Sequence, residues 1–170
     1  MVGREAWPAR GPRSTESDNC RMAPDPLTFT AHWSVRQYEV DHNGHVNNAV
    51  YLNYAEELAA RHSELSGFGQ DWSARQGGSW VIRRQEITYL SPARFGDELE
   101  LTVRVELVRG ARGQRRTTIV QQRTGEPVAE IFTEWVWVRE RDGRPAPVPR
   151  ALVEFAAGAT EATRKRRQRR

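Results

Sequence analysis

The stretch AVYLNYAEELAARHSEL, residues 49–65, contains no glycine or proline, and its apolar residues and one histidine recur at helical spacing. The residues on this stripe are Tyr51, Ala55, Leu58, Ala59, His62 and Leu65. Because residues three or four positions apart share one face of a helix, the stretch predicts an amphipathic helix of about four turns. Gly67 and Gly69 are expected to end this helix.

Segments on both sides of the helix alternate between apolar and polar residues, which is the pattern of half-buried strands. One segment precedes the helix and four follow it, at 28–40, 79–90, 98–108, 115–124 and 127–140. Turn-forming residues separate the last four, which predicts that they form a meander. Three prolines at 145–149 end the last strand, and a short helix is expected at 150–157.

The order of these elements predicts the fold class. One helix cannot cover both faces of five strands, so the expected fold is α+β, with a curved five-stranded antiparallel sheet wrapped around one long central helix. The uncovered sheet face and the edge strand need a partner. A homodimer or a homotetramer is therefore expected.

The composition changes at both ends of the chain. Residues 1–26 include four prolines and few apolar side chains, which predicts disorder. Six basic residues lie within 164–170, so 159–170 is expected to be a disordered basic tail, and 27–158 to be a single domain. Without those six charges the formal charge of +4 becomes −2, so nucleic acid is not an expected partner.

Several function classes are disfavoured by motifs that the sequence lacks. Cys20 is the single cysteine, and no run of apolar residues is long enough to cross a membrane or to form a secretion signal, so a cytoplasmic protein is expected. No residues have the spacing of metal ligands, and neither a phosphate-binding glycine loop nor a Gly-x-Ser-x-Gly motif is present. Neither a metal nor a cofactor is expected.

The polar stretch DHNGHVNN, residues 41–48, joins the first strand to the helix. A tight Asn-Gly turn and an asparagine that caps the helix explain part of it, but leave Asp41 and His45 unexplained. A helix N-terminus also presents free N–H groups that stabilise an oxyanion, and Asp41 lies seven residues before Asn48. A carboxylate and a helix start on opposite sides of one carbonyl would form a site for acyl transfer to water.

At this point the sequence resembles a known family. DHNGHVNNAVY (41–51) resembles the active-site segment of hotdog-fold thioesterases of the 4-hydroxybenzoyl-CoA thioesterase and acyl-ACP thioesterase group. ITYLSPARFGDELEL (87–101) resembles the second signature of the same family. The resemblance covers about residues 29–140 and implies hydrolysis of an acyl-CoA or acyl-carrier-protein thioester to a free acid and a thiol, in lipid, aromatic or polyketide metabolism.

The resemblance also implies roles for individual residues. Asp41 matches the carboxylate that acts as general base or nucleophile, and Asn43 and His45 match residues that orient this carboxylate or the water. Asn48 matches the position whose backbone N–H holds the thioester oxygen, and Tyr51 matches an aromatic residue near the acyl pocket. The plant enzymes carry two hotdog repeats in one chain. This chain carries one, so a second subunit is expected to complete the site.

Further candidates come from the tryptophans and arginines. Trp72 and Trp80 flank the Gly-Gly pair that follows the helix region, and are the expected wall of an acyl pocket. Arg112 and Arg115 belong to an arginine cluster at a predicted hairpin, where they would attract an anionic CoA or carrier protein. A solvated hairpin and ordinary core packing are the alternative explanations.

Three alternatives to this site and function stay open. Glu56 or Glu57 on the helix is an alternative catalytic acid. A hotdog enoyl-thioester hydratase or dehydratase would have an Asp-x-Asn-Pro-x-His pattern, which the segment 41–45 matches only in part because it lacks the proline and is one residue shorter. A non-catalytic sensor of acyl thioesters that contacts DNA through its basic tail is the third. His62, on the apolar stripe, is expected to be a satisfied core histidine.

Overall fold

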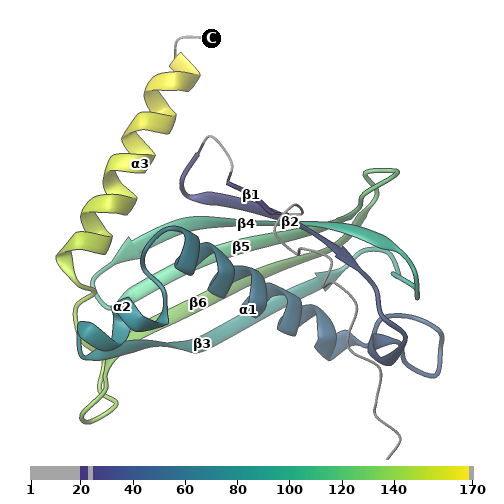
Figure 1. Cartoon of the computed structure of the whole chain (residues 1–170), viewed down its shortest axis with the longest axis horizontal. Helices are drawn as coiled ribbons and strands as arrows, with labels where there is room; N and C mark the ends of the chain where they lie inside the picture. The colour runs from purple at the N-terminus through teal and green to yellow at the C-terminus, as the bar shows by residue number, and fades with distance from the viewer. Residues whose placement is uncertain (1–19, 23–24, 169–170) are drawn as a thin grey trace, which may run out of the picture.

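A curved antiparallel sheet wraps around one long helix in the computed structural model, which describes residues 20–22 and 25–168 (Figure 1). The strands are β1 (Cys20–Met22), β2 (Thr28–Ser34), β3 (Gly78–Tyr89), β4 (Glu98–Arg109), β5 (Arg112–Gln121) and β6 (Pro127–Arg139). The helices are α1 (Asn48–Leu65), α2 (Gln70–Arg75), α3 (Arg150–Gln168) and a 3-10 turn at Gln37–Glu39. The expected fold class and its central helix are confirmed.

The sheet order is β1-β2-β4-β5-β6-β3, which corrects the expected meander of the last four strands. β3 pairs with β6 and not with β4, so the meander consists of β4, β5 and β6 alone. The segment 90–97 crosses the end of the sheet and so connects β3 to β4. At its start the Leu90 N–H donates to the Val128 carbonyl oxygen at 2.9 Å, and at its end the Asp97 carbonyl oxygen accepts from the Val35 N–H at 2.9 Å. Both bonds lie at strand ends, which sequence periodicity does not link.

A sixth strand forms within the N-terminal segment that was expected to be disordered. β1 pairs with β2 over three residues, with Cys20 opposite Ala31. The edge of β2 offers unpaired backbone groups, and three residues suffice to cover part of it. Residues 1–19 and 23–24 of that segment lie outside the described residues.

The helix α3 is longer than the expected 150–157 and continues to Gln168, so residues 159–168 of the expected tail lie in this helix. Two contacts stabilise the continuation. Ala159 is buried in a small cluster with Leu27, and Glu161 forms an i,i+4 ion pair with Lys165 at 2.7 Å. The last turns project away from the sheet (Figure 1). Residues 169–170 lie outside the described residues.

The core lies between α1 and the concave face of the sheet. The buried residues of α1 are Tyr51, Tyr54, Ala55, Leu58, Ala59 and His62, which closely matches the stripe predicted from the sequence. They face buried residues of the strands, among them Phe29, Leu99, Leu101, Val103, Ile119 and Ile131. α2 was not expected, because a six-residue helix is too short for its periodicity to be recognised.

β3 forms the far edge of the sheet and is hydrogen-bonded to β6 alone among the described strands. It carries two exposed apolar side chains, Val81 and Tyr89. In the part of the chain that the structure describes, no helix combines the length and the hydropathy needed to cross a membrane.

Candidate active site

The loop before α1 is a tight, hydrogen-bonded turn. The Asp41 N–H donates to the His45 carbonyl oxygen at 2.8 Å, and the Gly44 N–H donates to that of Asp41 at 3.0 Å. Gly44 has a φ of 75°, a conformation that suits glycine. Val40 and Val46 form an antiparallel bridge on either side of the turn. The tight turn that the sequence predicted for the polar stretch is therefore confirmed.

The same turn holds the carboxylate of Asp41 at the surface of the domain. Its Oδ1 accepts hydrogen bonds from the backbone N–H groups of Asn43 at 2.8 Å and His45 at 3.4 Å. The Asn43 N–H is the largest cause of a pKa below the usual aspartate value, so the carboxylate is ionised at neutral pH. Its Oδ2 accepts no backbone N–H of the described residues, and the side chain of Asn43 also helps to lower the pKa. One oxygen is thus held by the backbone of the turn.

The helix start lies at the other end of this loop. Asn47 is the N-cap, and its Oδ1 accepts from the Ala49 N–H at 2.9 Å. Asn48, the first helical residue, is exposed, and its backbone N–H has no acceptor among the described residues. Its carbonyl oxygen accepts from the hydroxyl of Tyr89, on the edge strand, at 3.0 Å. The free N–H of Asn48 is the amide that the family resemblance implies as the oxyanion donor.

Glu39, a buried acid that no sequence pattern indicated, holds the loop in place through hydrogen bonds. The carboxylate of Glu39 accepts from the Tyr54 hydroxyl and from the Arg36 N–H, each at 2.7 Å. Its carbonyl oxygen accepts from the Asn47 N–H at 2.9 Å. Burial, followed by Glu39 itself, raises the pKa of the Tyr54 hydroxyl, which stays protonated as the donor. Tyr54 was not on the stripe predicted from the sequence, so no local pattern indicated this pair.

Tyr51 lies in the core beneath the loop, and so does not line the cavity described below. Its hydroxyl accepts from the Ala93 N–H at 3.4 Å, and its ring meets that of Tyr89 edge-on at 5.6 Å. Ala93 also accepts the N–H of Val46 at 2.8 Å. Tyr51 therefore supports the crossing segment that holds the loop.

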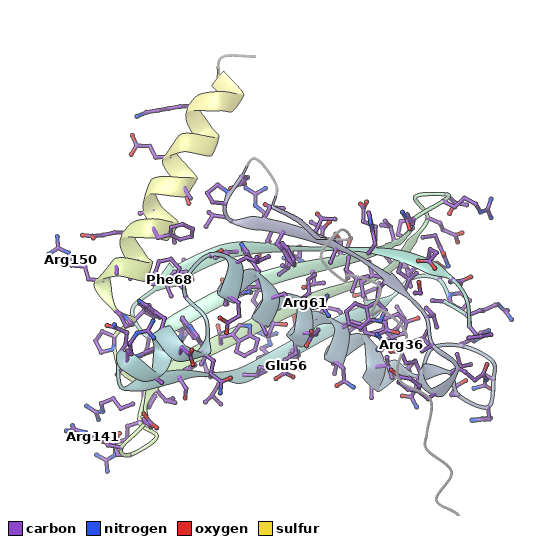
Figure 2. All side chains as sticks on the ribbon, viewed as in Figure 1. Arg36, Glu56, Arg61, Phe68, Arg141 and Arg150 are labelled. Atoms are coloured by element: carbon purple, nitrogen blue, oxygen red, sulfur yellow. The ribbon has the colours of Figure 1, made fainter. Side chains whose placement is uncertain are left out.

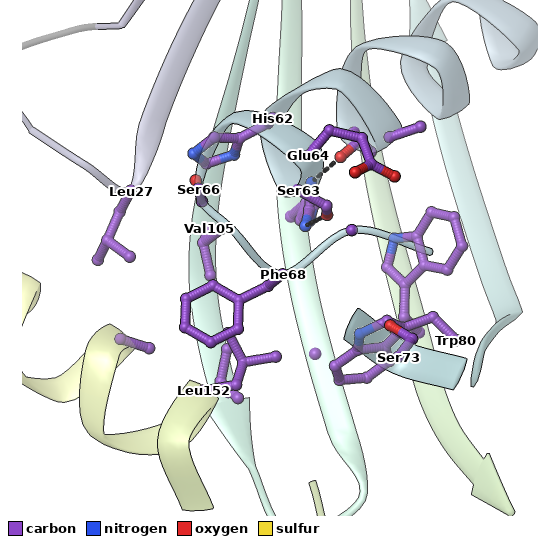
Figure 3. Close-up of a pocket in the computed structure, with 18 of the residues that line it drawn as sticks. Leu27, His62, Ser63, Glu64, Ser66, Phe68, Ser73, Trp80, Val105 and Leu152 are labelled. Atoms are coloured by element: carbon purple, nitrogen blue, oxygen red, sulfur yellow. Dashed lines mark hydrogen bonds between the residues drawn. The ribbon is translucent and has the colours of Figure 1, made fainter. Parts of the chain in front are cut away.

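A cavity of about 440 Å³ opens at the other end of α1, between its last turns, the sheet, and the helices α2 and α3 (Figure 3). Of the residues expected to bind substrate, Trp80 and Arg115 line it, as does the alternative acid Glu56. Its remaining walls come mainly from apolar residues: Leu27, Phe68, Val105, Leu107, Val108, Trp135, Leu152 and Phe155. The apolar walls from α3 were not expected, because that helix was assigned no function.

Three candidates lie outside the cavity. Trp72 packs against Trp137, with ring centroids 6.0 Å apart. Arg112 faces Glu134 at 3.8 Å. Glu57 pairs with Arg61 at 2.7 Å on the exposed side of α1.

Within one subunit the loop and the cavity are separated along α1. From Asn48 to Ala59, which lines the cavity, the helix rises by roughly 16 Å. In Figure 2 the labelled side chains run in the same order, with Arg36 near the loop, Glu56 on the middle of α1 and Phe68 beside the cavity. The structure brings Asp41, Asn43 and His45 together in one turn, with Asn48 at the helix start that follows it, and groups Trp80, Arg115 and Glu56 separately.

Two basic side chains lie beside the cavity, of which His62 is buried and Arg115 is half-buried. Arg115 donates to the Ala59 carbonyl oxygen at 2.8 Å and to the Ser63 Oγ at 2.9 Å, and burial lowers its pKa to about 10. His62 Nε2 lies 3.0 Å from the Pro26 carbonyl oxygen, so this nitrogen carries the proton. Burial, followed by the charge of Arg115, lowers the pKa of His62 to about 4. His62 was expected to be satisfied, but its Nδ1 has no partner among the described residues.

Metal chemistry receives no support from the described residues, which contain no group of three or more His, Cys, Asp or Glu side chains that could hold an ion. The chemistry available at the loop is that of an ionised carboxylate at Asp41 and of a free amide at Asn48, the helix start that follows. This pair can activate water, or attack a carbonyl, and stabilise the oxyanion that forms.

Known proteins resemble this chain in sequence and in fold. A family model described as the thioesterase-like superfamily matches residues 35–156. The acyl-acyl carrier protein thioesterase ATL3 of Arabidopsis thaliana is 33% identical over 118 residues, which cover 69% of this chain and 62% of that protein. The long-chain acyl-CoA thioesterase FadM of Escherichia coli is 31% identical over 104 residues, or 61% of this chain and 78% of that protein.

A solved structure extends the comparison to the fold. The crystal structure of a 1,4-dihydroxy-2-naphthoyl-CoA thioesterase from Synechocystis matches with a TM-score of 0.67 and 20% identity, over 72% of this chain and 90% of that one. At this identity the likeness shows the hotdog fold alone. The chain spans less than two thirds of the length of the acyl-acyl carrier protein thioesterases ATL3 and ATL2 of Arabidopsis thaliana, at 62% and 61%.

Proposed function

The chain belongs to the thioesterase-like superfamily, and we propose that it hydrolyses an acyl thioester to a free acid and a thiol. The observation that carries this proposal is an ionised carboxylate, Asp41, in the short loop that leads to the free N–H of Asn48 at the start of α1. The relatives are named for acyl carrier protein and for CoA substrates, so both carriers belong to the proposed substrate class.

In the proposed reaction Asp41 removes a proton from water as the water attacks the thioester carbonyl. The Asn48 N–H and the positive end of the α1 dipole stabilise the resulting oxyanion. The collapse of the tetrahedral intermediate breaks the C–S bond, and the thiolate takes up a proton. A general base of this kind contributes about 10²–10⁴-fold to the rate. A nucleophilic Asp41 would instead form a mixed anhydride that water resolves.

A second subunit is part of the proposed site. The free edge of β3 offers backbone groups for antiparallel pairing with another β3 about a two-fold axis. Such pairing would place the Tyr89 end of one strand beside the Ser79 and Trp80 end of the partner strand, because antiparallel neighbours run in opposite directions. Tyr89 contacts the loop at Asn48, whereas Ser79 and Trp80 line the cavity. The loop of one subunit would then face the cavity of the other, which would receive the acyl group.

The decisive experiment compares the wild type with Asp41→Asn on a panel of acyl-CoA and acyl-carrier-protein substrates, with thiol release as the readout. The amide oxygen of the introduced asparagine can still accept the two loop N–H groups, so the fold is expected to be retained. We expect turnover to fall by about 10²-fold or more. His42→Gln, at an exposed position in the same turn, serves as the matched control and should leave turnover unchanged.

Two outcomes would overturn this assignment. Full turnover in Asp41→Asn, with loss of turnover in Glu56→Gln or Glu57→Gln, would transfer the catalytic role to α1. Loss of enoyl absorbance without thiol release, measured on an enoyl thioester, would identify a hydratase in place of a hydrolase.

A further inference from the structure

The cavity at the end of α1 has the size and walls of a small-molecule site. Its volume of about 440 Å³ falls in the range of ligand pockets, about 300–1,000 Å³. Figure 3 shows Phe68, Val105 and Leu152 on one side and Trp80 on the other. These walls suit an aliphatic or aromatic body.

Arg115 is the cationic side chain among the residues that line this cavity. A guanidinium has five N–H donors, and Arg115 uses two of them, toward Ala59 and Ser63. The other three make no hydrogen bond to the described residues. Its position in β5 places the charge against the last turns of α1.

No carboxylate among the described residues lies within ion-pair distance of Arg115. Two acids also line the cavity, but neither forms an ion pair with Arg115. Glu64 is exposed and accepts the Gln70 N–H at 2.8 Å, and Glu56 is exposed on α1. Burial is the sole cause of the lowered pKa of Arg115, with no acid that offsets it. Arg115 is half-buried, and a partly desolvated charge without a counter-ion is costly, so an anion from outside would relieve that cost.

We propose that this cavity binds an apolar chain that ends in a carboxylate, and that the carboxylate pairs with Arg115. Two sources could supply this ligand. One is the acyl group of a half-thioester of a dicarboxylic acid, whose second carboxylate enters the cavity during the reaction proposed above. The other is a free fatty acid. The first source rests on the proposed function, whereas binding as such does not.

A purely structural role for Arg115 makes a different prediction. A side chain that only fastens β5 to α1 needs its bonds to Ala59 and Ser63, and would not distinguish ligands by charge. Ser63→Ala removes one of these bonds and keeps the charge. Arg115→Met keeps most of the apolar length and removes the charge.

The binding arm uses the tryptophan fluorescence of the full chain, since Trp80 and Trp135 both line the cavity. The probes are decanoate, decanol and decyltrimethylammonium, which share a chain and differ in the charge of the head group. In the wild type we expect decanoate to bind about tenfold more tightly than decanol, and the cation to bind least. This comparison needs no variant and therefore does not depend on the folding of one.

The variants then assign the preference to a residue. Arg115→Met should lose about tenfold in affinity for decanoate and keep that for decanol, while Ser63→Ala should keep the preference. Equal binding of decanoate and decanol by the wild type would overturn the proposal. So would an unchanged affinity of Arg115→Met for decanoate, with folding confirmed by circular dichroism.

The kinetic arm separates the two sources. Decanoyl-CoA is compared with the mono-CoA thioester of decanedioic acid, in the wild type and in Arg115→Met. A higher kcat/KM for the dicarboxylic substrate that Arg115→Met abolishes identifies the acyl group as the ligand. Binding of decanoate without this kinetic preference identifies a free fatty acid. Binding without hydrolysis of any thioester would contradict the proposed function and leave the carboxylate site standing.

Discussion

The hydroxyl of Tyr54 donates a 2.7 Å hydrogen bond to Oε2 of Glu39, and both side chains are buried. Glu39 precedes Asp41 by two residues, and its carbonyl oxygen accepts the N–H of Asn47, the cap of α1. One buried pair therefore connects the central helix to both ends of the loop that carries the proposed chemistry. The geometry of that loop depends on residues that need not touch a substrate.

Tyr54→Phe tests this connection. The change leaves the buried carboxylate of Glu39 with one donor fewer, so we expect the free energy of unfolding to fall by about 1–3 kcal/mol. Urea denaturation measures the effect. Tyr38→Phe is the matched control, because the Tyr38 hydroxyl accepts from Arg36 at the exposed surface and its loss should cost little. Equal losses in the two variants would contradict a special role for the buried pair.

Asn47→Ala tests the helix cap at the proposed oxyanion site. The side chain of Asn47 accepts the Ala49 N–H, so its removal should lower the free energy of unfolding by about 1 kcal/mol. Turnover should fall as well, because the neighbouring Asn48 amide loses its fixed direction. Asn53→Ala, at an exposed position within α1, controls for the change in helix propensity and should be neutral or slightly stabilising. A stable, fully active Asn47→Ala protein would argue against the helix start as an oxyanion site.

His62 predicts a pH dependence of stability. Its pKa is lowered to about 4 in the folded protein, whereas a histidine in the unfolded chain has a pKa of about 6.5. The unfolded state therefore binds more protons between these values. The stabilisation is complete above pH 6.5 and is lost as the pH falls from about 6.5 to about 4, with a total of roughly 3 kcal/mol.

Denaturation of the wild type and of His62→Leu between pH 4 and pH 7 measures this contribution. The variant lacks the titrating ring, so its stability should depend less on pH across this window. His42→Gln, which changes an exposed histidine, should follow the wild type. Parallel curves for the wild type and His62→Leu would show that His62 makes no such contribution.

Gly78→Ala and Gly158→Ala are expected to act in opposite directions. A Cβ at Gly78 would lie 2.6 Å from the ring of Trp137, so alanine should destabilise the protein by about 1–3 kcal/mol. A Cβ at Gly158 in α3 meets no atom within 4 Å, and alanine there should stabilise the helix by about 0.5–1 kcal/mol. Thermal unfolding of both variants provides the comparison. A neutral Gly78→Ala would show that Trp137 can move aside.

The sequence predicted the elements better than their arrangement. Periodicity identified α1 and the five long strands because each buries one face against a common core. The predicted neighbours of β3 were wrong because strand pairing depends on residues that lie far apart in the sequence, here Trp80 opposite Trp137. The length of α3 was missed because its last turns are polar and show no apolar stripe.

The candidate site was predictable in part for a similar reason. Local motifs identified Asp41 and the helix start, since both belong to one short loop. The pairing of Glu39 with Tyr54 and the hydrogen bond from Arg115 to α1 arise from tertiary contacts, and nothing nearby in the sequence reveals these partners. Trp72 was expected in the wall of a pocket and Arg112 in an arginine cluster that attracts an anionic carrier. In the structure Trp72 packs against Trp137, and Arg112 lies 3.8 Å from Glu134.

The wall of the cavity that α3 forms comes from a different part of the fold than the wall that the sheet forms. Leu152, Phe155 and Ala156 belong to a helix that follows the last strand, so no strand pairing depends on them. Relatives that share the sheet and the loop can therefore diverge in this terminal helix at little cost to folding. The choice of ligand would then evolve separately from the catalytic chemistry.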